Sequence, residues 1–350
     1  MRSDLFRQNC LHSSCKYILL ATACLAGCSG DTGSGSPIPS VDMASAPDAA
    51  PSAAKAQAFA LDSGVDNAAM DGLAIRLAWS RLEPTEGSYS FTQLDDALNK
   101  VATARKSATL HIFGAVAQGA TPSWVKTAGA QFYTANGRTD PVPWDSVYLT
   151  KWAAFVPKLA EHLTQAGTAS LVTRISITVP VPEMNLFSCT RGLLDSASIP
   201  FDRAKYLAAW KQMVDVYQSA FPTTAKLISA PQNGICLNDG DTKFFREVMD
   251  YALSKDAQHF GMFAADLSAV GSARVQPYVD LSSRAAISFQ PVAAFSNDPN
   301  RWVKGTMLEL YCAGLKLGGS YFEVYSADLT NADPAVQQGI GAIHDPSRCP

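Results

Sequence analysis

The strongest constraint on the fold is a regular alternation of strand-like and helix-like segments, which starts near Ala58 and continues to the end of the chain. This part of the sequence contains no linker-like segment and no internal repeat. Such alternation is typical of a parallel sheet covered by helices. The candidate strands are Ala58–Leu61, Leu73–Trp79, Ala108–Gly114, Arg174–Val179, Lys226–Ala230, Phe260–Ala264, Ala285–Phe289 and Ser320–Val324, and the clearest helices are Tyr148–Leu163, Ala204–Phe221, Phe244–Leu253 and Trp302–Leu315.

Eight strands of this kind predict an α/β protein with a single (β/α)8 TIM barrel domain, which we assign to residues 57–350. The length is close to the roughly 250 residues typical of that fold. The first strand is expected to lack its own helix, because only Ser63–Asp71 separate it from the next strand. A doubly wound open sheet is the alternative, and it is disfavoured because no G-x-G-x-x-G pattern lies at a strand-to-helix turn.

The N-terminal segment predicts export. Three basic residues within the first sixteen positions precede Tyr17–Ala26, an apolar run too short to span a membrane. The run ends in Leu-Ala-Gly before Cys28, which resembles the lipobox of bacterial lipoproteins. We therefore expect residues 1–27 to be a signal peptide and Cys28 to carry lipid. An ordinary secretory signal with a chance cysteine is the alternative.

Residues 28–56 are predicted to form a flexible, low-complexity tether. They are rich in Gly, Ser, Pro, Ala and Asp, and they lack a periodic apolar face. Ser29, rather than an acidic residue, follows Cys28, and by analogy with bacterial lipoproteins this favours sorting to the outer membrane. The expected location is the cell envelope, with the folded domain held off the membrane through the lipid at Cys28.

Four further cysteines remain after removal of the signal: Cys189, Cys236, Cys312 and Cys349. An even number in an exported protein suggests two disulfides, for which three connectivities exist. We pair Cys189 with Cys236, because both follow predicted strands that would be neighbours. Cys312 with Cys349 would then tie the last predicted helix to the C-terminus. Metal binding is disfavoured, because C-x-x-C and H-x-x-x-H spacings are absent and the five histidines are scattered.

Composition narrows the set of partners. The formal charge is −3 over 350 residues, so no broad basic surface indicates a nucleic-acid partner. Hydrophobic residues make up 47% of the chain, which is ordinary for a globular enzyme with a sizeable core. We expect a monomer without a cofactor or metal.

The segment Ile75–Leu98, IRLAWSRLEPTEGSYSFTQLDDAL, gives the first indication of function. It begins as a buried strand, which Glu83-Pro84 should end. A strand ending in W-x-x-L-E-P, then E-G-x-Y-x-F, then L-D, resembles the second strand and loop of (β/α)8 glycoside hydrolases related to bacterial β-galactosidase-type and cellulase-type families. A purely structural role for Glu83, as a cap of the loop, is the alternative for that residue.

Cleavage of a glycosidic bond needs a carboxylic acid and an opposed carboxylate, and barrel enzymes supply both from the carboxyl ends of strands. The resemblance implies that Glu183, after the fourth strand, is the acid, although Pro182 stands where these families carry asparagine. The seventh strand, where they carry the nucleophile, ends in Gln290. Glu323 in Y-F-E-V-Y is the second catalytic candidate, whether as nucleophile, as base or only as a sugar ligand. Asp266 is a further candidate carboxylate.

Other residues are candidates for binding substrate. The loop 115–147 is long and aromatic, as functional loops often are, and its Trp124 and Trp144 could stack on sugar rings or simply pack the loop. Arg76 resembles an active-site arginine of these hydrolases, and a salt bridge to Glu83 or Glu323 explains it equally well. The remaining candidates are Trp79 and the strand-end amides Asn185, Gln232, Asn233 and Gln290.

Two functions remain open from the sequence. The first is a lipid-anchored glycoside hydrolase that acts on an oligo- or polysaccharide, and the second is an inactive surface glycan-binding barrel. A barrel enzyme of another chemistry is a weaker alternative, because the sequence contains no phosphate-site motif, metal-site spacing or Ser-His-Asp set.

Overall fold

The computed structural model describes residues 55–115, 119–135, 137–180, 194, 197–229, 243–269, 276–298 and 303–350. All of them lie within one compact unit, Ala50–Pro350. The helices of the described residues include none that could span a membrane.

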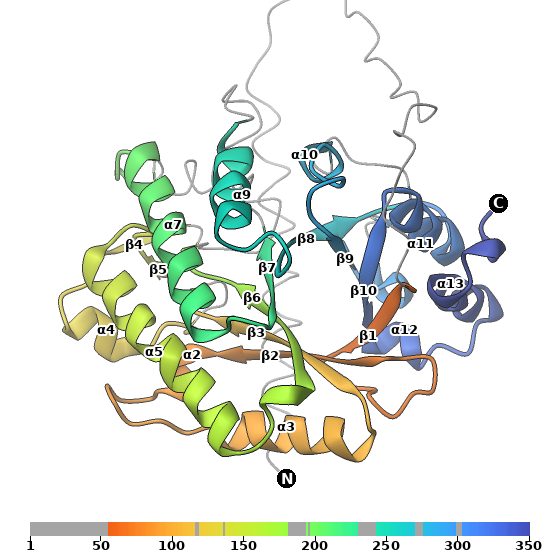
Figure 1. Ribbon diagram of the computed structural model, residues 1–350, viewed down its shortest axis with the longest axis horizontal. Helices are drawn as coiled ribbons and strands as arrows, with labels where there is room; N and C mark the ends of the chain where they lie inside the picture. Colours follow the sequence, from red (N-terminus) through yellow and green to blue (C-terminus); the bar gives the residue numbers. More distant parts are fainter. Residues whose placement is uncertain are drawn as a thin grey trace, which may run out of the picture. The chain divides into compact units, whose positions relative to one another are not determined.

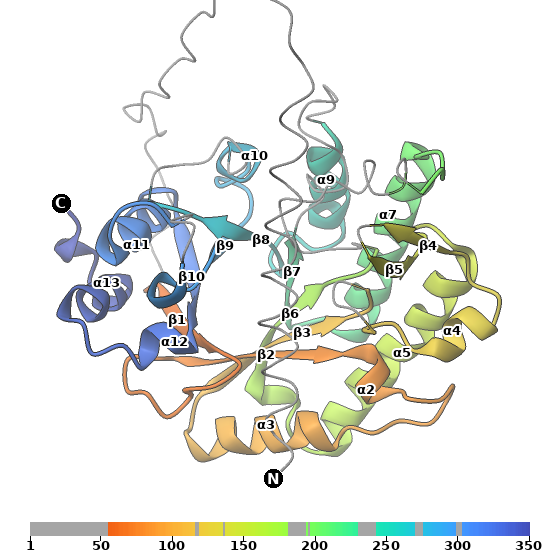
Figure 2. The same cartoon turned by 180° about the vertical axis from the view of Figure 1, so that it is seen from behind.

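Eight parallel strands form a closed barrel in the order β1-β10-β9-β8-β7-β6-β3-β2 (Figures 1 and 2). The barrel closes because β1 pairs with both β2 and β10, which excludes the open sheet. The predicted (β/α)8 barrel is therefore confirmed, and each predicted strand overlaps one that is observed. The strands are β1 (Gln57–Leu61), β2 (Gly72–Ala78), β3 (Ser107–Phe113), β6 (Val172–Ile177), β7 (Ala225–Ser229), β8 (Phe260–Leu267), β9 (Ile287–Pro291) and β10 (Gly319–Tyr325).

Helices surround the barrel, with α5 and α7 on one side and α11 and α13 on the opposite side in both views (Figures 1 and 2). The segment between β1 and β2 contains no helix, as predicted. The longer helices are α3 (Thr92–Thr103), α5 (Ser146–Gln165), α7 (Arg203–Ala220), α9 (Phe244–Lys255), α11 (Met307–Lys316) and α13 (Pro334–His344). Short helical turns lie at α2 (Trp79–Leu82), α4 (Ser123–Thr127), α10 (Gln276–Val279), α12 (Ser326–Leu329) and the 3-10 segments Ala169–Leu171, Phe295–Asn297 and Pro346–Arg348.

Local sequence explains where several helices begin. The Asp145 side chain accepts a hydrogen bond from the backbone N–H of Tyr148 and caps α5, and the two atoms lie 2.8 Å apart. Thr306 and Glu309 form a reciprocal capping box at α11. Because this box fixes the start of α11, the helix begins at Met307, later than the predicted Trp302.

The chain after β2 differs from the prediction. The strand ends at Ala78, and Trp79–Leu82 form the short helix α2 before Glu83-Pro84 is reached. The reason is local, because one helical turn brings the Trp79 indole Nε1 within 2.8 Å of Glu83 Oε2, four residues later. The indole is 0% exposed and packs edge-on against Trp152 of α5. Replacing such a buried indole by alanine typically costs about 3–5 kcal/mol.

The loop after β3 carries a short antiparallel pair, β4 (Phe132–Ala135) and β5 (Arg138–Pro141), besides α4. This pair and the following residues form a small apolar cluster of their own around Tyr133, Val142 and Leu194. The described part of the predicted loop 115–147 is thus ordered by packing.

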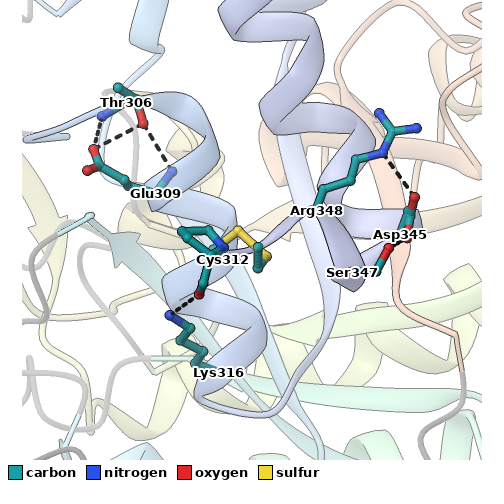
Figure 3. Close-up of a disulfide and its surroundings, with 9 residues drawn as sticks. Thr306, Glu309, Cys312, Lys316, Asp345, Ser347 and Arg348 are labelled. Atoms are coloured by element: carbon teal, nitrogen blue, oxygen red, sulfur yellow. Dashed lines mark hydrogen bonds and ion pairs between the residues drawn. A yellow bond between two sulfur atoms is a disulfide. The ribbon is translucent and has the colours of Figure 1, made fainter.

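The predicted disulfide Cys312–Cys349 is confirmed (Figure 3). It joins α11 to the C-terminal residues across 37 positions of sequence, a loop for which chain-entropy arguments give about 3–4 kcal/mol of stabilisation. The Lys316 ammonium donates to the backbone oxygen of Pro350 nearby. The predicted partner pair, Cys189 and Cys236, lies outside the described residues.

Candidate active site

The interior of the barrel is defined by a small cluster of side chains from strands that are far apart around the sheet. Strands so separated can only meet inside the barrel, so these side chains point inward, and by strand alternation so do residues two positions along. The cluster contains Phe59, Leu61, Ala74, Leu227, Phe263 and Tyr321.

This interior also holds a pair of polar side chains, His111 and Glu323. His111 lies on β3 and Glu323 on β10, three strands away around the barrel. His111 Nε2 lies 2.6 Å from Glu323 Oε1, and their side chains are 1% and 0% exposed. The Tyr321 hydroxyl donates to the same carboxylate oxygen at 2.8 Å. Glu323 is thus held from two sides in a water-poor environment, where electrostatic interactions are strong.

Two atoms of this pair have no hydrogen-bond partner within the described part of the chain: His111 Nδ1 and Glu323 Oε2. The carboxylate therefore has one oxygen fixed by hydrogen bonds and one enclosed oxygen with unused acceptor capacity. Glu323 lies within β10, which continues to Tyr325, one residue beyond the predicted strand. The strand numbering was right, since Gln290 lies on the seventh barrel strand and Glu323 on the eighth.

Arg76 lies on β2 next to His111 in the register. Its guanidinium pairs with Asp62, which follows β1, through Nε at 3.0 Å from each carboxylate oxygen and through Nη2. Arg76 thus forms its salt bridge with Asp62 and not with Glu83 or Glu323, which were the partners considered in the alternative reading, and its role as an active-site arginine stays a prediction. Partial burial alone would lower the pKa of Arg76, but Asp62 outweighs it and raises that pKa, with smaller contributions from Tyr325 and Glu323.

Gln290 on β9 donates to the Tyr325 hydroxyl, with 2.8 Å between the two atoms. Burial raises the pKa of Tyr325, while Arg76 and the hydrogen bond from Gln290 act in the opposite direction. An amide at this position can bind a hydroxyl but cannot attack an anomeric carbon.

Trp79 and Glu83 belong to the packing of the barrel wall. Trp79 is fully buried against its neighbours, and its role in substrate binding stays a prediction. Glu83 Oε1 accepts from the backbone N–H of Gly87 at 2.8 Å, while Oε2 accepts from Trp79. Burial raises the pKa of Glu83, and these two hydrogen bonds counteract it. Glu83 thus has the loop-capping role that was the alternative for it.

Trp124 and Trp144 are both partly buried. The Trp124 indole donates to the backbone oxygen of Glu83 at 3.0 Å and packs edge-on against Trp79. Trp144 packs edge-on against Phe201, with ring centroids 5.6 Å apart. Both indoles therefore contribute to packing, and their role as sugar platforms stays a prediction.

Asp266 is buried, at 5% exposure, and lies within β8 instead of after it. The strand is longer than predicted because its pairing with β9 continues past an irregularity between Ala264 and Leu267. The predicted site residues Glu183, Asn185, Gln232 and Asn233 lie outside the described residues, as does Cys28.

Several residues of this site were not singled out from the sequence: His111, Asp62, Tyr321 and Tyr325. His111 carried a usable signal, as the one ionisable residue of the buried strand SATLHIF. Tyr321 and Tyr325 flank Glu323 at the alternate positions that share its face. The contact between His111 and Glu323 could not be predicted, because the two residues are 212 positions apart in the sequence. No group of three or more His, Cys, Asp or Glu side chains in the described ranges could hold a metal ion.

Fold and site together define a (β/α)8 barrel with a buried carboxylate held by hydrogen bonds in its interior. Residues 68–170, which run from just before β2 to the end of the segment after α5, match the family model of the family 42 glycosyl hydrolases, described as β-galactosidase. No match to a curated protein is found.

Solved structures with a similar arrangement are distant in sequence. An exo-β-1,4-mannosidase from Opitutaceae bacterium strain TAV5 is 13% identical with a TM-score of 0.49, over 84% of this chain and 56% of that protein. A GH10 protein from Paenibacillus barcinonensis is 13% identical with a TM-score of 0.49, over 85% of this chain and 96% of its own. Xylanase B from Clostridium stercorarium F9 is 10% identical with a TM-score of 0.46, over 77% of this chain and 86% of the xylanase. This chain thus spans little more than half of the mannosidase, and the barrel assignment rests on its own strand order.

Proposed function

We propose that this protein is a glycoside hydrolase that acts on an oligo- or polysaccharide with a pair of carboxylates, Glu183 and Glu323. The observation that carries the proposal is the state of Glu323, a carboxylate with one oxygen fixed by His111 and Tyr321 and the other without a partner among the described residues. The match of residues 68–170 to the β-galactosidase family supports the same chemistry.

The two carboxylates would have different tasks. Glu183, which follows the fourth barrel strand, would protonate the leaving oxygen of the glycosidic bond. Glu323 would act from the opposite side of the sugar ring, either as the nucleophile or as the base that activates a water molecule. Partial charges that develop on the sugar would be stabilised by the fixed polar groups of the interior.

The test is hydrolysis of a panel of aryl glycosides and plant and bacterial polysaccharides by the wild type and by Glu183→Gln and Glu323→Gln. Each substitution keeps the shape of the side chain and removes its acid–base chemistry, so we expect turnover to fall by about 100- to 10,000-fold. The matched control is Glu161→Gln on the exposed face of α5, where Glu161 pairs with Lys158 and Gln165, and it should keep full activity. Full activity in either site variant would remove that residue from the mechanism.

A second candidate function, glycan binding without cleavage, is favoured by Gln290 on the seventh barrel strand. If the wild type cleaves nothing in the panel but retards in affinity electrophoresis on one of the same polysaccharides, the binding function replaces the hydrolase. Gln290→Ala should then weaken retention, because it removes a donor held beside Tyr325.

We also propose that the protein is a lipoprotein of the cell envelope, anchored through Cys28. The support is the sequence alone, with small residues before Cys28 and a polar tether after it. Replacing Cys28 by alanine should move the exported protein from the membrane fraction to the soluble fraction, because the tether offers no other apolar anchor. Unchanged membrane association of that variant would contradict the anchor.

A further inference from the structure

We propose that His111 is a positioning residue that selects which oxygen of Glu323 acts on the substrate. The Nε2–H group of His111 donates to Oε1, and Oε2 is left as the acting oxygen. This inference rests on the proposed hydrolase function and adds to it a residue on a different strand of the barrel.

The position of the histidine proton follows from burial. Nδ1 of His111 is enclosed and has no hydrogen-bond partner within the described part of the chain. A proton on Nδ1 would be a buried donor without an acceptor, which is strongly unfavourable, whereas a bare ring nitrogen loses less. The proton therefore lies on Nε2, 2.6 Å from Glu323 Oε1, and the imidazole donates to the carboxylate.

The acceptor capacity of Oε1 is then used up. A carboxylate oxygen has two lone pairs, and Oε1 accepts from both His111 Nε2 and the Tyr321 hydroxyl. The two donors come from β3 and β10, so they fix the carboxylate from two directions. Oε2 keeps its lone pairs, and these are what a nucleophile or a base needs.

Arg76 does not take this role. Its electrostatic interaction with Glu323 is present but small, and its hydrogen bonds go to Asp62. The aromatic ring of Phe263, 5.4 Å from the imidazole between ring centroids, limits rotation of His111 on another side. The ring is thus held in place by packing while Nε2 holds the carboxylate.

The kinetic test compares His111→Ala with His111→Gln. Alanine removes the donor, so we expect kcat to fall by about 100-fold through misplacement of Glu323, with KM nearly unchanged because the acting group and not the binding surface is disturbed. Glutamine carries an amide N–H at about the distance of Nε2 from the backbone, so it should recover most of the lost kcat. Added imidazole should partly restore His111→Ala.

A matched control is His162→Gln. His162 also pairs with a carboxylate, Nε2 to Asp95 Oδ1 at 2.7 Å, but it lies on α5 outside the barrel. This variant should keep kcat and KM. A wild-type kcat in folded His111→Ala, or an equal loss in His111→Gln and His111→Ala, would overturn the positioning role while leaving the hydrolase function intact.

Nitrogen-15 NMR of the imidazole in the wild-type protein is a readout that needs no activity. In the wild type we expect the proton to be bound to Nε2. When Glu323 is replaced by alanine, we expect the proton to exchange between Nε2 and Nδ1. A proton fixed on Nδ1 in the wild type would overturn this inference alone. Failure of the wild type to cleave any glycan would overturn the hydrolase function and the positioning role together.

Discussion

At the scale of single residues, the buried lysine Lys226 shows how burial changes the pKa of a charged group. Lys226 at the start of β7 is wholly buried, and its ammonium donates to the backbone oxygens of Phe221 and Thr224 at 2.9 and 3.0 Å. Burial lowers the pKa of Lys226 from 10.5 to about 8, although Asp256 opposes that change. The lysine donates to carbonyl groups just after α7, and its burial makes deprotonation easier than it is in water.

This lowered pKa gives stability a predictable dependence on pH. Between pH 8 and 10.5 the unfolded chain keeps a proton on Lys226 that the folded protein has lost, so the free energy of unfolding rises with pH in that window. Below pH 8 both states are protonated, and this contribution is constant. We expect Lys226→Met to remove up to about 3 kcal/mol of that rise, as measured by denaturant unfolding of both proteins from pH 7 to 10.

The control is Lys100→Met, at an exposed position of α3. It should leave the pH dependence of the wild type unchanged. Parallel curves for the wild type and Lys226→Met above pH 8 would contradict the assignment to Lys226.

At the scale of elements, the strands and long helices were predictable because their apolar periodicity is local. The short helix α2 was not predicted, because its formation depends on the contact of Trp79 with Glu83 and with Trp152 on a distant helix. The W-x-x-L-E-P motif that ends at Glu83-Pro84 and resembles glycoside hydrolases thus also has a structural role. It joins α2, the turn at Gly87 and the loop that carries Trp124.

Glu83→Gln tests this structural role. The amide offers one acceptor oxygen where the carboxylate offers two, so one of the donors, Trp79 Nε1 or Gly87 N–H, is left unpaired. We expect stability to fall by about 1–3 kcal/mol without loss of kcat, measured by chemical unfolding and by turnover. The neighbouring Glu86→Gln, at an exposed pair with Lys151, should change stability by less than about 1 kcal/mol. Loss of turnover in a folded Glu83→Gln would instead make Glu83 part of the active site.

At the scale of the whole molecule, the barrel could be predicted but the site only in part. Eight buried strands in alternation with helices are compatible with few folds that contain a parallel sheet. The sheet closes into a barrel because β1 pairs with β10. Glu323 could be singled out as a lone charge in an apolar strand. The residues that surround Glu323 could not be predicted. The strand register decides which residues of other strands face it, and a shift of one residue turns every side chain of a strand to the other side of the sheet.

The barrel order also bears on the stereochemistry of the proposed reaction. Glu183 follows β6, and β6 lies four strands from β10, directly across the barrel. Carboxylates that approach a sugar from opposite walls favour the wider separation of roughly 6.5–9.5 Å, which leaves room for a water molecule, over the roughly 5–5.5 Å of a direct nucleophile. We therefore expect Oε2 of Glu323 to act as a base and the first product to carry the inverted anomeric configuration. Proton NMR of a fresh digest, recorded before mutarotation, distinguishes the anomers. A retained anomer would instead mean that Oε2 attacks the sugar itself, and a fluorinated glycoside should then label Glu323 covalently.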